Sequence, residues 1–309
     1  MNLNARPRLL VGLALGLCLA TAACGVNGPK SATDGAGGQA PVPAPAAASG
    51  KVTGLGLVIE DSGKVQLCLG AVAESYPPQC SGVPLANWSW SGRNDFEDAN
   101  GVKFATYAVT GTYDGTTLTV TDEPISAALY DPLPDPSAGR ALSTRCAEPA
   151  DGWRVTNPAR ATAVALTTAE ETALGLDGYV THWNDMFATF EVDGTASEPA
   201  ITDDLGSQGT EDLALVLNVL VRGDVADATQ RLRTVWGGAL CVSNPLHTQR
   251  QLDQIARRLG NADAVASAFV QYDRVVAEVT YDDGSLQDYA DATFGKDAVV
   301  IVSGLHTTS

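Results

Sequence analysis

Residues 107–120 read YAVTGTYDGTTLTV and carry the clearest fold signal in the chain. Residues that favour β-strands alternate on both sides of the dipeptide Asp114-Gly115. Because this dipeptide suits the tight turn of a β-hairpin, the segment predicts two antiparallel strands that are joined at that turn.

Further β-strand signals lie on the N-terminal side of this hairpin. The alternation of Leu55, Leu57 and Ile59 predicts another strand, and no helical pattern longer than two turns occurs between residues 51 and 140. We therefore expect residues 51–155 to form a β-rich domain, either a small antiparallel sheet or a small barrel of the OB type.

The second half of the chain mixes strand and helix patterns. Residues 213–221, LALVLNVLV, are almost all apolar and predict a buried strand. Apolar residues at helical spacing follow in residues 225–235, and residues 239–243 predict another strand. This order is typical of a β-α-β unit, so we expect residues 156–309 to form an α/β sandwich and the whole chain to be of the α+β class.

Other patterns add elements to this second domain. A capping-box pattern at residues 167–170 predicts the start of a short helix. Helical spacing predicts two more helices, over residues 252–260 and 262–269. Strands are expected over residues 274–281 and 298–303.

The N-terminus has the pattern of an export signal. Arg6 and Arg8 precede an apolar run at residues 9–20, and the small residues 21–23 lead to Cys24. Twelve residues at about 1.5 Å each are too short to cross a hydrocarbon layer of about 30 Å. The segment therefore predicts a leader rather than a transmembrane helix.

The end of this leader, TAAC followed by glycine, resembles the lipobox of bacterial lipoproteins. Ala22, Ala23 and Cys24 fit that pattern, whereas Thr21 stands where the family prefers leucine. The resemblance implies that residues 1–23 are removed and that Cys24 becomes a lipid-modified N-terminus. It places the protein at the cell membrane, lipid-anchored, on the extracytoplasmic side. The alternative is a secreted protein that is cleaved after Ala22.

A linker is expected between this anchor and the first domain. Residues 24–50 are rich in glycine, alanine, serine and proline and offer little to bury. Such a segment can hold a folded domain away from the membrane.

The cysteine count agrees with an oxidising compartment. Of the six cysteines, Cys18 belongs to the leader and Cys24 would carry the lipid. The remaining four are an even number, as expected for disulfides outside the cytoplasm.

Spacing favours one of the three possible pairings of these four cysteines. Cys68 and Cys80 are close in sequence and flank a turn, which leaves Cys146 to pair with Cys241. The spacing does not match the ligands of a zinc site, so no metal is expected there.

The charge balance excludes one class of partner. Nineteen lysine and arginine residues face 36 aspartate and glutamate residues, a formal net charge of −17. Because nucleic-acid binding needs a basic surface, we expect no nucleic acid as a partner. The excess of carboxylates is compatible with a cation or a basic partner.

No catalytic or cofactor motif occurs in the chain, and no cofactor is expected. Among three histidines, His182 is the best general-base candidate because Asp185 lies near it in sequence. The alternative is an ordinary half-buried histidine on a strand. Pairs of adjacent carboxylates lack the spacing of a calcium loop, so no metal site is predicted.

Three aromatic residues form a candidate ligand shelf. Trp88 and Trp90 would point the same way on a strand, and Tyr76 precedes two prolines. The alternative is that these large side chains form the core of a small domain.

These observations favour a lipid-anchored envelope protein that binds or scaffolds rather than catalyses. Its partners would be the membrane, through the lipid on Cys24, and an envelope protein or ligand that the sequence does not identify. One alternative is an extracytoplasmic hydrolase that uses His182 and Asp185. Another is a lipoprotein that binds a solute or a cation.

Overall fold

The structure, a computed structural model, describes residues 40–130, 139–186, 188, 190–192, 195–197 and 214–308. The predicted leader, Cys24 and the linker up to residue 39 lie outside these residues. Within the described part of the chain, no helix has the length and apolar character needed to span a bilayer.

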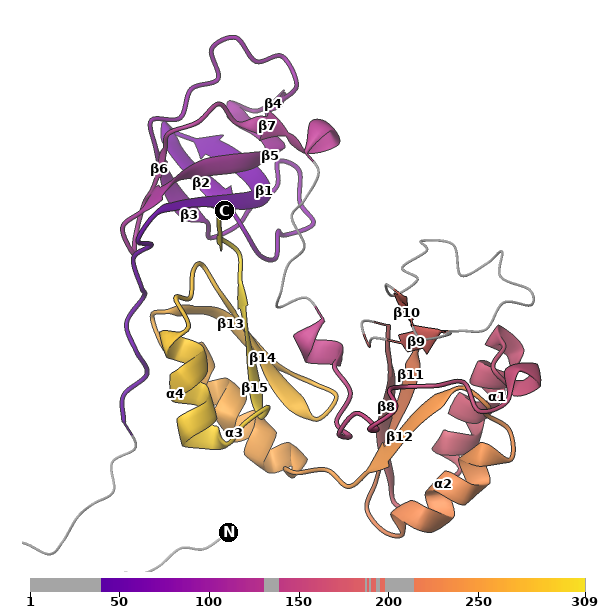
Figure 1. The fold of residues 1–309 in the computed structure, drawn as a ribbon. Coiled ribbons are helices and arrows are strands. Elements are labelled where there is room, and N and C mark those ends of the chain that lie inside the picture. Colours follow the sequence, from indigo (N-terminus) through magenta and orange to yellow (C-terminus); the bar gives the residue numbers. More distant parts are fainter. Residues whose placement is uncertain are drawn as a thin grey trace, which may run out of the picture. The chain divides into compact units, whose positions relative to one another are not determined.

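The first part of the described chain is a closed five-stranded barrel (Figure 1). Its strands and the short elements around them are β1 (Lys51–Asp61), β2 (Lys64–Cys68), β3 (Val83–Ala86), β4 (Glu97–Ala99), β5 (Val102–Tyr113), β6 (Leu118–Val120), β7 (Ile125–Ser126) and the 3₁₀ turn Ala127–Leu129. β1 pairs antiparallel with both β2 and β5, and β3 pairs parallel with β6, so the order β1-β2-β3-β6-β5 closes on itself. This topology is of the OB type, and the predicted β-rich barrel is confirmed.

Two glycines permit the strands of the barrel to approach closely. A Cβ atom at Gly56 would lie 2.2 Å from the carbonyl oxygen of Cys68, and one at Gly111 would lie 2.1 Å from that of Thr119. A side chain at either position would therefore force two neighbouring strands apart.

The predicted hairpin is confirmed at the end of β5. The carboxylate of Asp114 accepts hydrogen bonds from the backbone N–H groups of Thr116 and Thr117, both at 2.8 Å. Gly115 has a φ of +99°, which a residue with a side chain rarely adopts. Asp114 and Gly115 thus fix the turn between β5 and β6.

The second part of the chain contains the order α-β-β-α-β twice (Figure 1). The first repeat is α1 (Ala163–Leu174), β8 (Tyr179–Asp185), β11 (Val216–Val221), α2 (Val225–Arg233) and β12 (Ala239–Ser243), with β9 (Phe190–Val192) and β10 (Thr195–Ser197) between β8 and β11. The second repeat is α3 (Gln249–Gly260), β13 (Val265–Gln271), β14 (Arg274–Val279), α4 (Ser285–Phe294) and β15 (Val299–Ser303). In both sheets the middle strand is antiparallel to the first strand and parallel to the third. The predicted α+β class and the β-α-β unit are therefore confirmed.

Two predictions for individual elements are wrong, and one helix was not predicted. Residues 262–269 do not form a helix, because residues 265–271 form strand β13, which pairs with β14. Helix α4 was not predicted, and α1 begins at Ala163 rather than near residue 167. Thr162 caps α1 by accepting a hydrogen bond from the backbone N–H of Ala165 at 3.3 Å.

The chain between the barrel and the first repeat packs against that repeat. Its regular elements are the 3₁₀ turns Arg140–Leu142 and Pro158–Arg160. Trp153 is buried in a cluster with Val216, Ala239 and Cys241.

Residues 139–146, which we call the connecting segment, join the two α/β sheets. Cys146 forms a disulfide with Cys241 of β12. The Nε atom of Arg145 lies 2.7 Å from a carboxylate oxygen of Asp273, in the turn between β13 and β14. Arg274 donates hydrogen bonds to the carbonyl groups of Arg140 and Ser143. One short segment is thus bonded to both sheets.

The second disulfide, Cys68–Cys80, closes the loop that follows β2 in the barrel. The two pairs are the ones that the spacing favoured.

Residues 40–50 contain no helix or strand, yet they contact the folded part of the chain. The backbone N–H of Ala48 donates to the carbonyl oxygen of Tyr113 at 2.9 Å. Val42 packs against the core beneath α3 and α4, and the carbonyl oxygen of Ala40 accepts from Arg258.

The Asp114 turn predicts a pH-dependent loss of stability. The backbone N–H groups of Thr117 and Thr116 hold the pKa of Asp114 below its usual range. Since the folded pKa lies below the unfolded one, the stabilisation is complete above the unfolded pKa of about 4 and is lost as pH falls through the folded value. Asp114→Asn should lower the melting temperature by a few degrees at pH 7. Between pH 5 and pH 3, the melting temperature of this variant should fall less than that of the native chain.

Circular dichroism across that pH range measures both effects. Asp177→Asn, in an exposed turn outside the barrel, is the control. A variant at Asp114 whose melting temperature follows that of the native chain at every pH would contradict this account of the turn.

Candidate functional site

The second α/β sheet has helices on one face only. Apolar residues of α3 and α4 form a core with Val275, Ala277 and Val279 of β14. Since side chains alternate along a strand, Arg274, Val276 and Glu278 lie on the other face. We call this helix-free surface of β13–β15 the open face.

The open face is covered at one end and accessible at the other. Arg274 is 1% exposed beneath the connecting segment, and Val276 is 4% exposed. Phe269, which pairs with Val276 across β13 and β14, is 43% exposed. Glu278 is half-buried and lies next along the face. The accessible end therefore begins at Phe269 and Glu278.

The outer surface of the barrel provides a second wall. Val52 and Val58 of β1 point into the barrel core, so Leu55 points outward, where its side chain is 43% exposed. Leu69 and Ser81 of the barrel line the same space.

The C-terminal segment fixes the open face beside the barrel. β16 (His306–Thr307) pairs with β1, and Leu305 is buried in the barrel core. The rings of Tyr113 and Tyr281 also meet, with centroids 6.3 Å apart.

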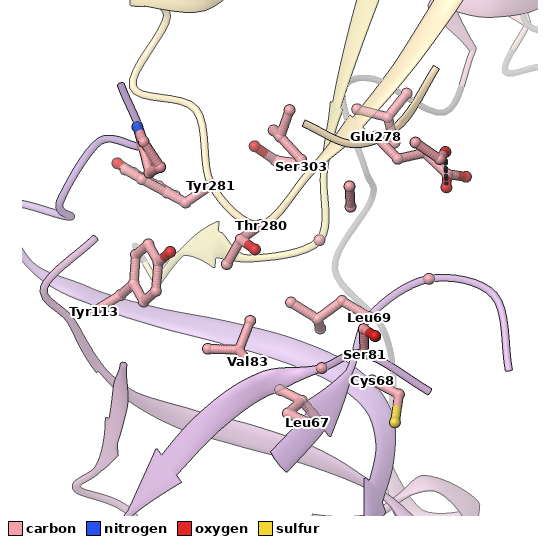
Figure 2. A pocket seen from close by; sticks show the side chains of 18 of the residues that line it. Leu67, Cys68, Leu69, Ser81, Val83, Tyr113, Glu278, Thr280, Tyr281 and Ser303 are labelled. Atoms are coloured by element: carbon pink, nitrogen blue, oxygen red, sulfur yellow. Dashed lines mark hydrogen bonds between the residues drawn. The ribbon is translucent and has the colours of Figure 1, made fainter. Parts of the chain in front are cut away.

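These walls enclose a groove with a volume of about 1180 Å³ (Figure 2). Figure 2 shows Leu67, Leu69 and Val83 on the barrel side and Glu278, Thr280 and Ser303 on the sheet side. We call this space the groove. The groove lies within one compact unit, Ala40–Ser309.

The groove combines apolar walls with a few polar groups. The hydroxyl of Ser267 donates to a carboxylate oxygen of Glu278 at 2.7 Å (Figure 2). The Tyr113 hydroxyl donates to the carbonyl oxygen of Gly115 at 2.7 Å, and burial raises the pKa of Tyr113. Asp263 is the second carboxylate in the lining, which contains no lysine or arginine. Such a surface can bind a ligand through apolar contact and negative charge.

Metal binding has no support in the part of the chain that the structure describes. No group of three or more histidine, cysteine, aspartate or glutamate side chains is arranged there to hold a metal ion.

The predicted pair His182 and Asp185 does not form a shared site. Asp185 is 3% exposed and accepts hydrogen bonds from the backbone N–H and the hydroxyl of Thr144, at 2.7 and 2.8 Å. His182 Nδ1 lies 2.7 Å from the hydroxyl of Tyr179. The two residues are three positions apart on β8, so their side chains point to opposite faces, and neither lines the groove.

The predicted aromatic shelf is split between two places. Trp90 lies in the barrel core, and its ring centroid is 5.1 Å from that of Trp88. The guanidinium of Arg93 lies 5.3 Å from the Trp88 ring and 5.1 Å from the Tyr107 ring. These rings therefore pack against one another and against a cation of the same chain.

Tyr76 lies apart from the two tryptophans. It is 71% exposed, packs edge-on against Phe104 and donates a hydrogen bond to Glu97 at 3.1 Å. This bond raises the pKa of the Tyr76 hydroxyl.

Sequence reasoning missed the β13 side of the groove because it assigned residues 262–269 to a helix. The available signal was the alternation of residues along 267–270. Ala268 and Val270 pack against the core beneath the helices, and Ser267 and Phe269 lie on the open face, as expected for a strand.

Cys24 and the linker up to residue 39 lie outside the described residues.

Comparisons of the chain with protein-family models, curated proteins and solved structures found no match.

The structure predicts different roles for Asp185 and His182. Asp185→Ala should lower the free energy of unfolding by about 2–4 kcal/mol, because the N–H and hydroxyl groups of Thr144 lose a charged acceptor. His182→Gln should change it by less than about 1 kcal/mol, since this half-buried ring has one hydrogen bond.

Urea denaturation of both variants measures the difference. If His182→Gln proved to be the more destabilising change, the structural role assigned to Asp185 would be wrong.

Proposed function

We propose that this chain is a lipid-anchored extracytoplasmic protein that binds a ligand in the groove. The groove itself is the observation that carries the proposal. Its mixture of apolar walls and few polar groups is the usual composition of a binding site. Its two walls come from the barrel and from the open face of β13–β15, so binding there uses both parts of the chain.

The extracytoplasmic location is supported by the disulfides and by the leader. Two disulfides are formed by the four cysteines that follow Cys24. Disulfides persist in oxidising compartments and are rare in the cytoplasm. The lipobox-like end of the leader supports an anchor at Cys24, with the linker between the membrane and the barrel.

The alternative functions gain no support from the described residues. A hydrolase would need His182 and Asp185 in one pocket, and they lie on opposite faces of β8. A cation site would need converging ligands, and none was found among the described side chains. Binding of an organic ligand fits the groove better than either.

A neutral apolar probe tests whether the groove binds ligands. The probe is a blocked hexapeptide of alternating serine and valine that carries a benzophenone side chain. The full-length protein, in discs of phosphatidylcholine, should form light-induced crosslinks to residues of the groove. Phe269→Ser should reduce the crosslinking yield about fivefold at low probe concentration, because about 1 kcal/mol of apolar contact is lost.

Val164→Ser is the matched control, since Val164 is 78% exposed on α1 and lies outside the groove. Crosslinks spread over surfaces away from the groove, or an unchanged yield in Phe269→Ser, would refute the assignment of the groove.

A further inference from the structure

We propose that the ligand of the groove is an extended basic peptide that carries apolar and cationic side chains on the same side of its backbone. This inference rests on the proposed binding function of the groove. The groove volume of about 1180 Å³ exceeds the range of about 300–1,000 Å³ that is typical of small-molecule pockets. A chain laid along the groove fits this space better than one enclosed small molecule.

Strand β13 offers backbone hydrogen bonds to such a chain. β13 is the edge strand of its sheet, and no strand among the described residues pairs with its outer edge. Four residues in and just before β13 line the groove: Ala264, Ala266, Ser267 and Phe269. An extended peptide can pair with an exposed edge of this kind and so continue the sheet.

Apolar side chains of the peptide would meet apolar residues on both walls. Leu55 on the barrel and Phe269 on the sheet are each 43% exposed. In an extended chain, alternate side chains point to the same side. Every second residue of the peptide can therefore contact these walls.

The charge of the groove selects a further side chain on the side of the peptide that faces the groove. One oxygen of Glu278 accepts the Ser267 hydroxyl, and no salt bridge among the described residues involves Glu278 or Asp263. The lining has no lysine or arginine to offset these carboxylates. The net charge of −17 repels anionic peptides and attracts basic ones at long range. Because Glu278 and Phe269 lie on the same face, a lysine or arginine on the groove-facing side of the peptide, next to its apolar residues, complements the groove.

Three fluorescent hexapeptides test the inference. Each has serine at positions 1, 3 and 5 and valine at positions 2 and 6. Position 4, on the same side of the backbone as the valines, is lysine in the first peptide, serine in the second and glutamate in the third. Each is titrated by fluorescence anisotropy with the full-length protein in phosphatidylcholine discs, and empty discs are the blank. The lysine peptide should bind about tenfold more tightly than the serine peptide, and the glutamate peptide should bind most weakly.

Two variants then test whether Glu278 causes the preference for the lysine peptide. Glu278→Gln should weaken binding of the lysine peptide about tenfold and leave binding of the serine peptide nearly unchanged. Glu171→Gln is the control, because Glu171 is an exposed carboxylate on α1.

Methylating the backbone nitrogens of alternate residues in the lysine peptide should abolish binding if the peptide pairs with β13.

The possible failures are separable. If the lysine and serine peptides bind the native protein equally, or if methylation has no effect, the peptide inference is wrong. If the neutral benzophenone probe still reacts in the groove, the proposed function survives that failure. If the probe does not react there, both fail. The native-protein titrations decide the matter even if Glu278→Gln does not fold.

Discussion

The ion cluster of Arg145, Asp273 and Arg274 is the constraint on which the arrangement of the two α/β sheets depends. The side chains of these residues are 8%, 3% and 2% exposed. Burial lowers the pKa of Arg274, while the Asp273 carboxylate favours its charged form. Removing one partner from such a buried cluster leaves a charge without compensation, which costs about 3–5 kcal/mol. The cluster therefore requires the connecting segment to remain in place.

The position of the connecting segment explains why the groove exists. Each α-β-β-α-β repeat covers one face of its sheet with helices and leaves the other face free of helices. In the second repeat, the connecting segment bonds to Arg274 and covers the end of the open face near that residue. The end at Phe269 and Glu278 stays accessible, and Leu305 and β16 hold the barrel beside it. The groove is thus a consequence of an incompletely covered sheet.

Elements that depend on residues close in sequence were largely predicted. Features that depend on contacts between distant segments were missed. Asp114-Gly115 predicted the hairpin correctly because both residues stabilise the turn through local contacts and backbone conformation. The β-α-β unit could be predicted because its buried strand, β11, lies in a sequence segment that is almost wholly apolar. Strand β13 was mistaken for a helix because its apolar residues also fit helical spacing, and only pairing with β14 decides between them. The groove could not be predicted, because Leu55 and Phe269 are brought to the same site by contacts between segments far apart in sequence. Asp185, a candidate for catalysis, instead anchors Thr144.

The central claim is that the connecting segment is locked to β12 in a protein that faces an oxidising compartment. Mass-spectrometric peptide mapping without reduction, on protein isolated from the membranes of its own cells, tests this claim most directly. The account predicts a disulfide-linked peptide pair containing Cys146 and Cys241, another containing Cys68 and Cys80, and an acylated N-terminal Cys24. A free thiol at Cys146, or Cys24 without lipid inside an uncleaved leader, would contradict it.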